Sequence, residues 1–273
     1  MIAPMDPLQQ IAATFAFQQS CGHASEDTSL ARYVRSPALP DIWVANHVSL
    51  VRAQHAGEID EVLERTEQAL AHCAHRMFFV DALTPPAFVA RLALDGYTEL
   101  SPTLHMVLDG ELRADRSQVE LRAVERDDDW EAFYELLRAN HLEKLVHGLS
   151  LREEITRGIV AAHRAKAGTV QFFLAIVDGA PRAYGSAIVA PHGMGIVEDL
   201  FTLPAYRRRG LATALIANAI AYARERGMGP MLIGAFADEA PKALYASLGF
   251  QPRCLTRQYL LDREPFESSP TAR

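Results

Sequence analysis

Residues 196–227, IVEDLFTLPAYRRRGLATALIANAIAYARERG, decide the fold of this chain. Residues 196–203 form a nearly continuous apolar run that only Glu198 and Asp199 interrupt. Such a run is typical of a strand buried on both faces. Apolar side chains then recur at helical spacing until Gly227, a residue type preferred just past a helix C-terminus. The stretch therefore predicts a buried strand, a turn and a helix.

The turn between this strand and this helix carries Arg207, Arg208 and Arg209, followed by Gly210. The first turn of a helix has unpaired backbone N–H groups and the positive end of the helix dipole. Gly210 and Ala212 leave the backbone open to close approach, and arginines donate in pairs to phosphate. In a chain of formal net charge -7, three adjacent arginines favour a phosphate site over a solvated charge run.

Two motifs resemble those of the GNAT acetyltransferase superfamily. Arg207-x-x-Gly210-x-Ala212, placed after a strand, resembles the pyrophosphate loop of that family. Residues 243–250, ALYASLGF, resemble its second motif, in which a tyrosine on a helix shortly precedes Gly-Phe. The motifs occur in the family's order and separation, and the resemblance covers residues 118–263. It implies an α/β (α+β) fold with a mixed twisted sheet flanked by helices, and acetyl-CoA as cosubstrate without a metal.

Length and composition limit the other function classes. A chain of 273 residues with 49% hydrophobic and 22% charged residues predicts about two globular domains. Three widely spaced cysteines indicate reduced thiols in a cytosol, and the acidic balance argues against nucleic acid as a partner. We see no basic leader and no apolar run of ~18 residues, so we expect a cytoplasmic protein without a membrane partner. The run His72-Cys73-Ala74-His75 has no second ligand pair, and we expect no metal there.

The expected order of elements can be followed along the whole chain. Before residue 112 we expect a helix capped by Asp6, a polar loop over 21–29, strands over 30–34 and 42–51, and helices that begin near Gly57 and Pro85. From residue 119 on we expect strand, two helices, hairpin, central strand, loop, helix, strand, helix and strand. Ser150 opens the second of those helices, and Asp178-Gly179 turns the hairpin. The second series is the order that the family resemblance implies.

An internal repeat relates the two halves. Gly57 precedes Gly210 by 153 positions (210 minus 57), and the same offset relates Tyr97 to Phe250 and a whole strand–helix–strand–helix series. We therefore predict two tandem GNAT-like domains, a degenerate one over residues 1–112 without the early helices and a catalytic one over residues 118–265. Residues 266–273 are predicted to be a disordered tail. An unrelated α/β domain with a coincidental offset is the alternative.

The first half has lost the chemistry at its repeat positions. Ile59 places a β-branched side chain where the second half has a small residue, and Glu58, Asp60 and Glu61 place negative charge where a pyrophosphate would lie. Leu92 stands where the second motif has its tyrosine. We expect one CoA molecule per chain, in the second half.

The resemblance also implies the cosubstrate contacts. The pyrophosphate would take the loop N–H groups of Arg207, Arg208, Arg209, Gly210, Leu211 and Ala212. The pantetheine arm would pair with the backbone of Leu200, Phe201 and Thr202, as an added strand does. Asp238 stands where the family has an asparagine at the start of the next helix, which weakens one pantetheine contact, although aspartate caps helices equally well.

Acyl transfer to an amine needs an acid for the leaving thiolate and a path for the amine proton. Tyr245 is the candidate acid, with packing at a domain surface as the alternative. Glu198 is the candidate base, because a carboxylate in an apolar strand must be paired, shifted in pKa or catalytic. Strand alternation places Glu198 on one face with Leu200 and Thr202, and Asp199 on the other unless a bulge turns it.

The acceptor pocket of such proteins lies near the first two helices, which here carry Tyr134, His141, Glu143 and His147. A solvated helix face is the alternative for each. The sequence thus predicts an N-acetyltransferase that moves an acetyl group to a primary amine, with a small-molecule acceptor. A protein amine acetyltransferase and a non-catalytic acyl-CoA sensor are the alternatives, and a homodimer is left open.

Overall fold

The computed structural model describes residues 5–114, 118–144 and 153–263. The chain divides into two compact units that are not contiguous in sequence. The first unit comprises residues 1–105, 235–239 and 253–273, and the second comprises residues 106–234 and 240–252. Three strands are divided between the units: β5 (Thr98–Leu108), β10 (Met231–Phe236) and β11 (Gln251–Asp262).

Five strands lie side by side in the first unit, in the order β1 (Ala24–Asp27), β2 (Arg32–Arg35), β3 (His47–Ser49), β4 (His75–Val80) and β11. Neighbours are antiparallel except β3 and β4, which run parallel. In the register of β4 and β11, Val80 lies opposite Arg257 and Phe78 lies opposite Tyr259. The last strand of the chain therefore completes the sheet of the first unit.

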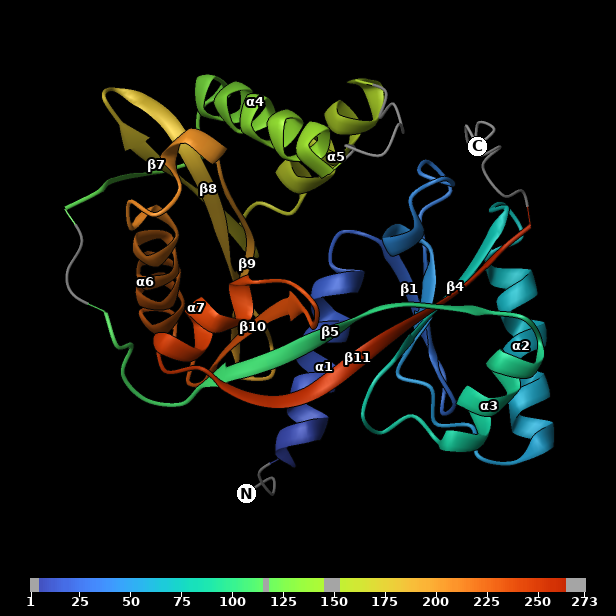
Figure 1. The fold of residues 1–273 in the computed structure, drawn as a ribbon. Helices are drawn as coiled ribbons and strands as arrows, with labels where there is room; N and C mark the ends of the chain where they lie inside the picture. The colour runs from blue at the N-terminus through green and yellow to red at the C-terminus, as the bar shows by residue number, and fades with distance from the viewer. Residues whose placement is uncertain (1–4, 115–117, 145–152, 264–273) are drawn as a thin grey trace, which may run out of the picture. The chain divides into compact units, whose positions relative to one another are not determined.

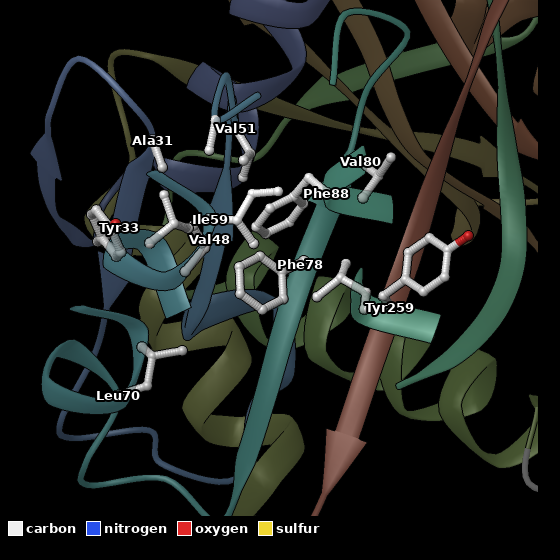
Figure 2. Close-up of a cluster of buried hydrophobic side chains, with 13 residues drawn as sticks. Ala31, Tyr33, Val48, Val51, Ile59, Leu70, Phe78, Val80, Phe88 and Tyr259 are labelled. Atoms are coloured by element: carbon white, nitrogen blue, oxygen red, sulfur yellow. The ribbon is translucent and has the colours of Figure 1, made fainter. Parts of the chain in front are cut away.

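Helices α2 (Ala56–Ala69) and α3 (Pro86–Leu94) cover one face of this sheet. Figure 2 shows the buried cluster between these helices and the sheet. Phe78 of β4 lies close to Phe88 of α3 in it, at 5.3 Å between ring centroids. Ile59 from α2 and Tyr259 from β11 belong to the same cluster. Burying each large apolar side chain stabilises the fold by about 1.5–3 kcal/mol.

Helix α1 (Pro7–Ser20) begins as predicted at Asp6, whose carboxylate accepts hydrogen bonds from the N–H groups of Leu8 and Gln9. Two other expectations for this unit are wrong. The predicted polar loop over residues 21–29 contains β1, a fully exposed edge strand whose sequence ASED lacks apolar alternation. The strand predicted over residues 42–51 is limited to β3.

Asn46 explains why that strand begins late. A 3₁₀ helix spans Trp43–Ala45, and the Asn46 side chain accepts from the N–H of Ser36 and donates to two backbone carbonyls of the same loop. His72 and His75 also hydrogen-bond Asn46, so both histidines of the His-Cys-Ala-His run support this turn.

The second unit orders its strands β10, β9 (Gly195–Thr202), β8 (Ala180–Val189), β7 (Val170–Val177) and β6 (Glu120–Ala123). β9 and β10 are parallel and the other pairs are antiparallel. The predicted hairpin between β7 and β8 is confirmed, with Asp178 and Gly179 both at positive φ in the turn.

The described residues of this unit form four α-helices: α4 (Asp127–Lys144), α5 (Glu153–Ala165), α6 (Leu211–Arg224) and α7 (Pro241–Ser247). Tyr184 of β8 meets Phe133 of α4, at 5.0 Å between rings, whereas its neighbour Gly185 lies against Leu215 of α6. Successive strand residues point to opposite faces, so α4 and α6 cover opposite faces of this sheet (Figure 1). The helix start predicted at Ser150 lies outside the described residues.

The series β3, α2, β4, α3, β5 recurs as β9, α6, β10, α7, β11, which confirms the predicted internal repeat. Gly96 and Gly249, which end the equivalent helices α3 and α7, have φ values of 84° and 104°. The first half connects β1 to β2 and β2 to β3 without counterparts of α4 and α5, as expected. The predicted fold class is thus confirmed. Among the described residues, no helix has the length and apolar character needed to cross a bilayer.

Candidate functional site

A β-bulge interrupts β9 in the middle of the second unit. Ser186 of β8 lies opposite Glu198, but Tyr184, two residues earlier, lies opposite Phe201, three residues later. β9 therefore contains one extra residue, and Asp199 adopts a left-handed φ of 54° there. Such bulges turn side chains in new directions and are frequent next to active sites.

The bulge changes which side chains share a face of β9. Glu198 and Phe201 lie opposite Ser186 and Tyr184 and therefore face α4. Leu200 faces α6, because a Cβ atom placed on Gly185 would lie 2.8 Å from its Cδ2 atom. The expectation that Glu198 shares a face with Leu200 and Thr202 is therefore wrong, because the extra residue shifts the alternation by one.

Asp199 lies on the α4 face together with Glu198. The Ser186 hydroxyl donates to Asp199 Oδ2 at 3.3 Å. Burial lowers the pKa of His163 on α5, while the negative charge of Asp199 opposes that shift. Burial, and secondly Asp199, raises the pKa of Tyr184. The carboxylates of Glu198 and Asp199 therefore lie on the same face of β9, whereas strand alternation predicted that they lie on opposite faces.

Residues of α4 and α5 contact the sheet on this same face. Asn140 Nδ2 donates to the Tyr184 hydroxyl at 2.8 Å, and the half-buried His163 ring lies 4.9 Å from the ring of Phe172. Sequence reasoning missed Asn140, Tyr184 and His163, because only tertiary contacts bring them to the bulge. For Asp199, the sequence offered one signal of a site residue: two neighbouring acidic residues in an otherwise apolar strand.

The loop after β9 opens the start of α6 to solvent. Arg208 and Gly210 have φ values of 62° and 80°. Gly210 is the N-cap of α6 and provides no side-chain hydrogen bond to the first turn. A Cβ atom placed on Gly210 would meet no other heavy atom of the described residues within 4 Å. The first N–H groups of α6 are thus left for an external acceptor.

The three loop arginines are exposed and differ in their partners. Arg207 Nη2 donates to both carboxylate oxygens of Glu143 on α4, at 2.7 and 2.5 Å, and Arg207 Nε donates to the Thr202 carbonyl at 3.0 Å. The Arg209 guanidinium lies 5.0 Å from the centre of the Tyr206 ring. An ion pair therefore links α4 to the loop.

Tyr245 lies on α7 and is 6% exposed, with its ring 6.3 Å from that of Phe250. Asp238 belongs to the first unit, where it is exposed and accepts from the Ser101 hydroxyl at 3.5 Å. The N-cap residue of α7 is Ala240, without a side-chain cap, so Asp238 does not cap the helix as expected. The helix begins later because Pro241 occupies its first position.

The candidate acceptor residues on α4 make contacts with α5. The buried Tyr134 ring lies under the Arg157 guanidinium at 4.1 Å, and burial raises the Tyr134 pKa. His141 Nδ1 lies 3.0 Å from the Thr156 hydroxyl oxygen. These contacts are those of packed helices, and a role in the acceptor pocket stays a prediction. His147 lies outside the described residues.

A family model described as "Acetyltransferase (GNAT) family" matches residues 130–250. These residues form a GNAT domain. The GNAT domain contains the bulge in β9, the loop arginines, α6 and α7.

A curated relative, a mycothiol acetyltransferase from Thermomonospora curvata, is 34% identical over 105 residues, which are 38% of this chain. The match spans only 33% of that relative's length. A GCN5-related N-acetyltransferase from Kribbella flavida has a similar structure, with a TM-score of 0.68, 17% identity and coverage of 93% of this chain and 95% of that one. A tandem GNAT protein from the clavulanic acid biosynthesis pathway has a TM-score of 0.58 at 17% identity, over 80% of this chain and 74% of that one. At these identities the two structures show the fold alone, and the second of them is described as a tandem GNAT protein.

Proposed function

We propose that the protein is an N-acetyltransferase that moves the acetyl group of acetyl-CoA to a primary amine of a small molecule. The observation that carries the proposal is the start of α6, which has no side-chain cap and three exposed arginines before it, directly after the bulged strand β9. The GNAT family of the domain and the name of the curated acetyltransferase relative support the same activity.

The N–H groups of residues 208–212 would bind the pyrophosphate of acetyl-CoA. The predicted contribution of the Arg207 N–H is corrected, because it donates to the Pro204 carbonyl at 3.3 Å and leaves Arg207 only its side chain for the phosphate. A helix start with open N–H groups and a positive dipole end stabilises an anion there, and the arginines add charge-assisted donors. The backbone after the bulge, at residues 200–202, would pair with the amides of the pantetheine arm. This arrangement would hold the thioester beside the bulge.

In the reaction, the amine nitrogen attacks the thioester carbonyl, a C–N bond forms and the C–S bond breaks. Glu198 would accept the amine proton, directly or through a water molecule, and the Tyr245 hydroxyl would donate a proton to the CoA thiolate. Placement of Glu198 on the α4 face supports this role, because α4 is the expected acceptor side. Asp199, held by the Ser186 hydroxyl, adds a second negative charge that favours a cationic acceptor.

Thiol release tests the activity directly. Purified protein is mixed with acetyl-CoA and a panel of small primary amines, and each amine is matched by the alcohol of the same shape. We expect CoA release with at least one amine and none with its alcohol. Release only with peptide amines would favour a protein acetyltransferase. Calorimetric binding of acetyl-CoA without release by any acceptor would favour a sensor and contradict the proposal.

A further inference from the structure

A cavity of about 350 Å³ lies in the first unit, outside the GNAT domain. Leu50 and Arg52, which follow β3, and Leu83, which follows β4, line it. β3 and β4 run parallel, so these residues lie beyond the carboxyl ends of two adjacent parallel strands. Ligands of α/β sheets bind preferentially there, and the cavity volume falls at the small end of ligand pockets.

We propose that this cavity binds a small organic carboxylate. Two arginines line it, Arg32 and Arg52. Arg32 is held by Asp27 through two hydrogen bonds of 2.6 and 2.7 Å, and Arg52 is held by Asp81 through two of 3.1 Å. Each arginine is thereby fixed in position before a ligand arrives, which lowers the cost of binding.

The hydrogen-bond capacity of these pairs selects an acceptor as the ligand group. Both oxygens of Asp27 accept from Arg32, and the hydrogen bond with Arg32 keeps the Asp27 pKa below its ordinary value. Nη1 of Arg32 and Nε of Arg52 make no hydrogen bond to any other described residue. Each arginine therefore keeps an N–H donor that the chain does not use, and a ligand carboxylate can accept from it.

The remaining lining suits a short apolar body on that carboxylate. Besides the arginines, the cavity is lined by the Asp27 side chain that pairs with Arg32, by the polar residues Gln9, Thr28 and Ser29, and by apolar side chains. The apolar ones are Met5, Ala13, Ala31, Leu50 and Leu83.

The test uses the full chain labelled with ¹³C at its methionine methyl groups and titrated with hexanoate. Met5 lines the cavity, and Met231 is buried in the GNAT domain and serves as an internal reference. We expect the methyl resonance of Met5 to shift and reach a plateau as hexanoate is added, while the methyl resonance of Met231 does not move. Hexanamide, the neutral analogue, should bind at least ~10-fold more weakly, because it lacks the charge that strengthens the arginine hydrogen bonds.

Arg32→Met removes one of the two proposed donors and should weaken hexanoate binding ~10-fold. Arg65→Met is the matched control, since Arg65 pairs with Glu26 of the same sheet edge at 2.5 Å and does not line the cavity. It should change the affinity less than ~2-fold. Ala13→Trp fills the cavity and replaces Arg32→Met if that variant does not fold. An unmoved Met5 signal, equal binding of hexanamide, or full binding by both folded cavity variants overturns the proposal. Because no acetyl-CoA is present, these outcomes are independent of the acetyltransferase activity.

Discussion

The starts of α2 and α6 hold equivalent places in the repeat but differ in what their N–H groups meet. Before α2, the chain's own Glu58 accepts from the N–H groups of Gln54 and His55, at 2.8 and 3.1 Å. Before α6, Gly210 stands at φ 80° with no side-chain cap. The same backbone design is therefore self-capped in one half and left open in the other.

If the start of α6 binds a phosphate as proposed, this difference is one way in which an anion site is lost without a change of fold. A helix start needs an acceptor, and either a ligand or a nearby side chain can supply it. In α2 one carboxylate, three residues into the helix, accepts from two N–H groups of the preceding turn, and its negative charge would repel a phosphate there. The four predictions below break or sharpen the comparison, starting with the largest expected effect.

Tyr245→Phe tests whether the acid of the reaction lies in the second half. In the first half Leu92 of α3 holds the equivalent place, and leucine has no hydroxyl to donate. Removal of one hydroxyl should lower kcat ~100-fold or more with little change in the Kd of acetyl-CoA. Steady-state kinetics and calorimetry separate the two effects. The control is Tyr222→Phe on α6, where the tyrosine packs against Phe173 and Arg226. An unchanged kcat in Tyr245→Phe would mean that solvent protonates the thiolate.

Gly210→Glu gives α6 the kind of carboxylate that α2 already has. We expect the CoA affinity to fall well over ~10-fold, which corresponds to more than ~1.4 kcal/mol. Gly57→Glu is the matched control, because Gly57 has no positive φ and has space for a Cβ atom. Calorimetry of the native chain should give one CoA per chain.

The φ of 80° strains any side chain at position 210, so circular dichroism must first show that Gly210→Glu folds. Arg209→Glu supplies a second variant that changes the loop charge without using the glycine. Unchanged CoA affinity in both folded variants, or two CoA per native chain, would contradict the assignment of the loop.

Glu143→Gln weakens the ion pair that holds Arg207 toward α4. Removing this negative charge should raise the CoA affinity by about 2- to 5-fold, the range expected for an exposed ion pair. Glu111→Gln is the control, since Glu111 pairs with Arg224 at the other end of α6. Calorimetry at two salt concentrations measures the effect, which salt should reduce. A loss of affinity would show instead that Glu143 positions Arg207 for binding.

Glu58→Ala removes the carboxylate that caps α2. Its hydrogen bonds from the N–H groups of Gln54 and His55 hold the pKa of Glu58 below its ordinary value. A lowered folded-state pKa contributes stability that is present above the unfolded pKa and lost as the pH falls through the folded one. Native protein should therefore have a slightly higher Tm than Glu58→Ala at pH 7, and the difference should vanish in acid.

The control for this last variant is Glu64→Ala, an exposed glutamate further along α2. A Tm difference that grows as the pH falls would mean that Glu58 does not act as an ionised cap. Glu58→Ala is not expected to create CoA binding, because Asp60 and Glu61 remain negative and Ile59 remains bulky.

The order of elements could be predicted from the sequence wherever the signals were local. The strand–loop–helix series from β9 to α6 and the turn at Asp178-Gly179 follow from apolar spacing, glycines and caps. The edge strand β1 could not be predicted, because its pairing with β2 leaves no apolar pattern in four exposed residues.

The candidate site was predictable in part. The loop arginines and Tyr245 stand in recognisable motifs, and their roles in the site remain predictions. The prediction that Glu198 and Leu200 share a face of β9 was wrong. A bulge depends on how β8 and β9 pair and not on either sequence alone. Asn140 and His163 were missed for the same reason: both depend on where α4 and α5 pack.

The pairing of β4 with β11 has a consequence for how the protein is made. Val80 of β4 cannot pair with Arg257 of β11 until Arg257 has been synthesised, 177 residues later (257 minus 80). At a synthesis rate of ~10 residues per second that delay lasts on the order of 18 seconds, during which β4 has an unpaired edge. Tyr259, which closes the core around Phe78, arrives just as late. The half of the protein that is synthesised first is therefore completed last, and nascent chains are most exposed to aggregation and chaperone binding in that interval.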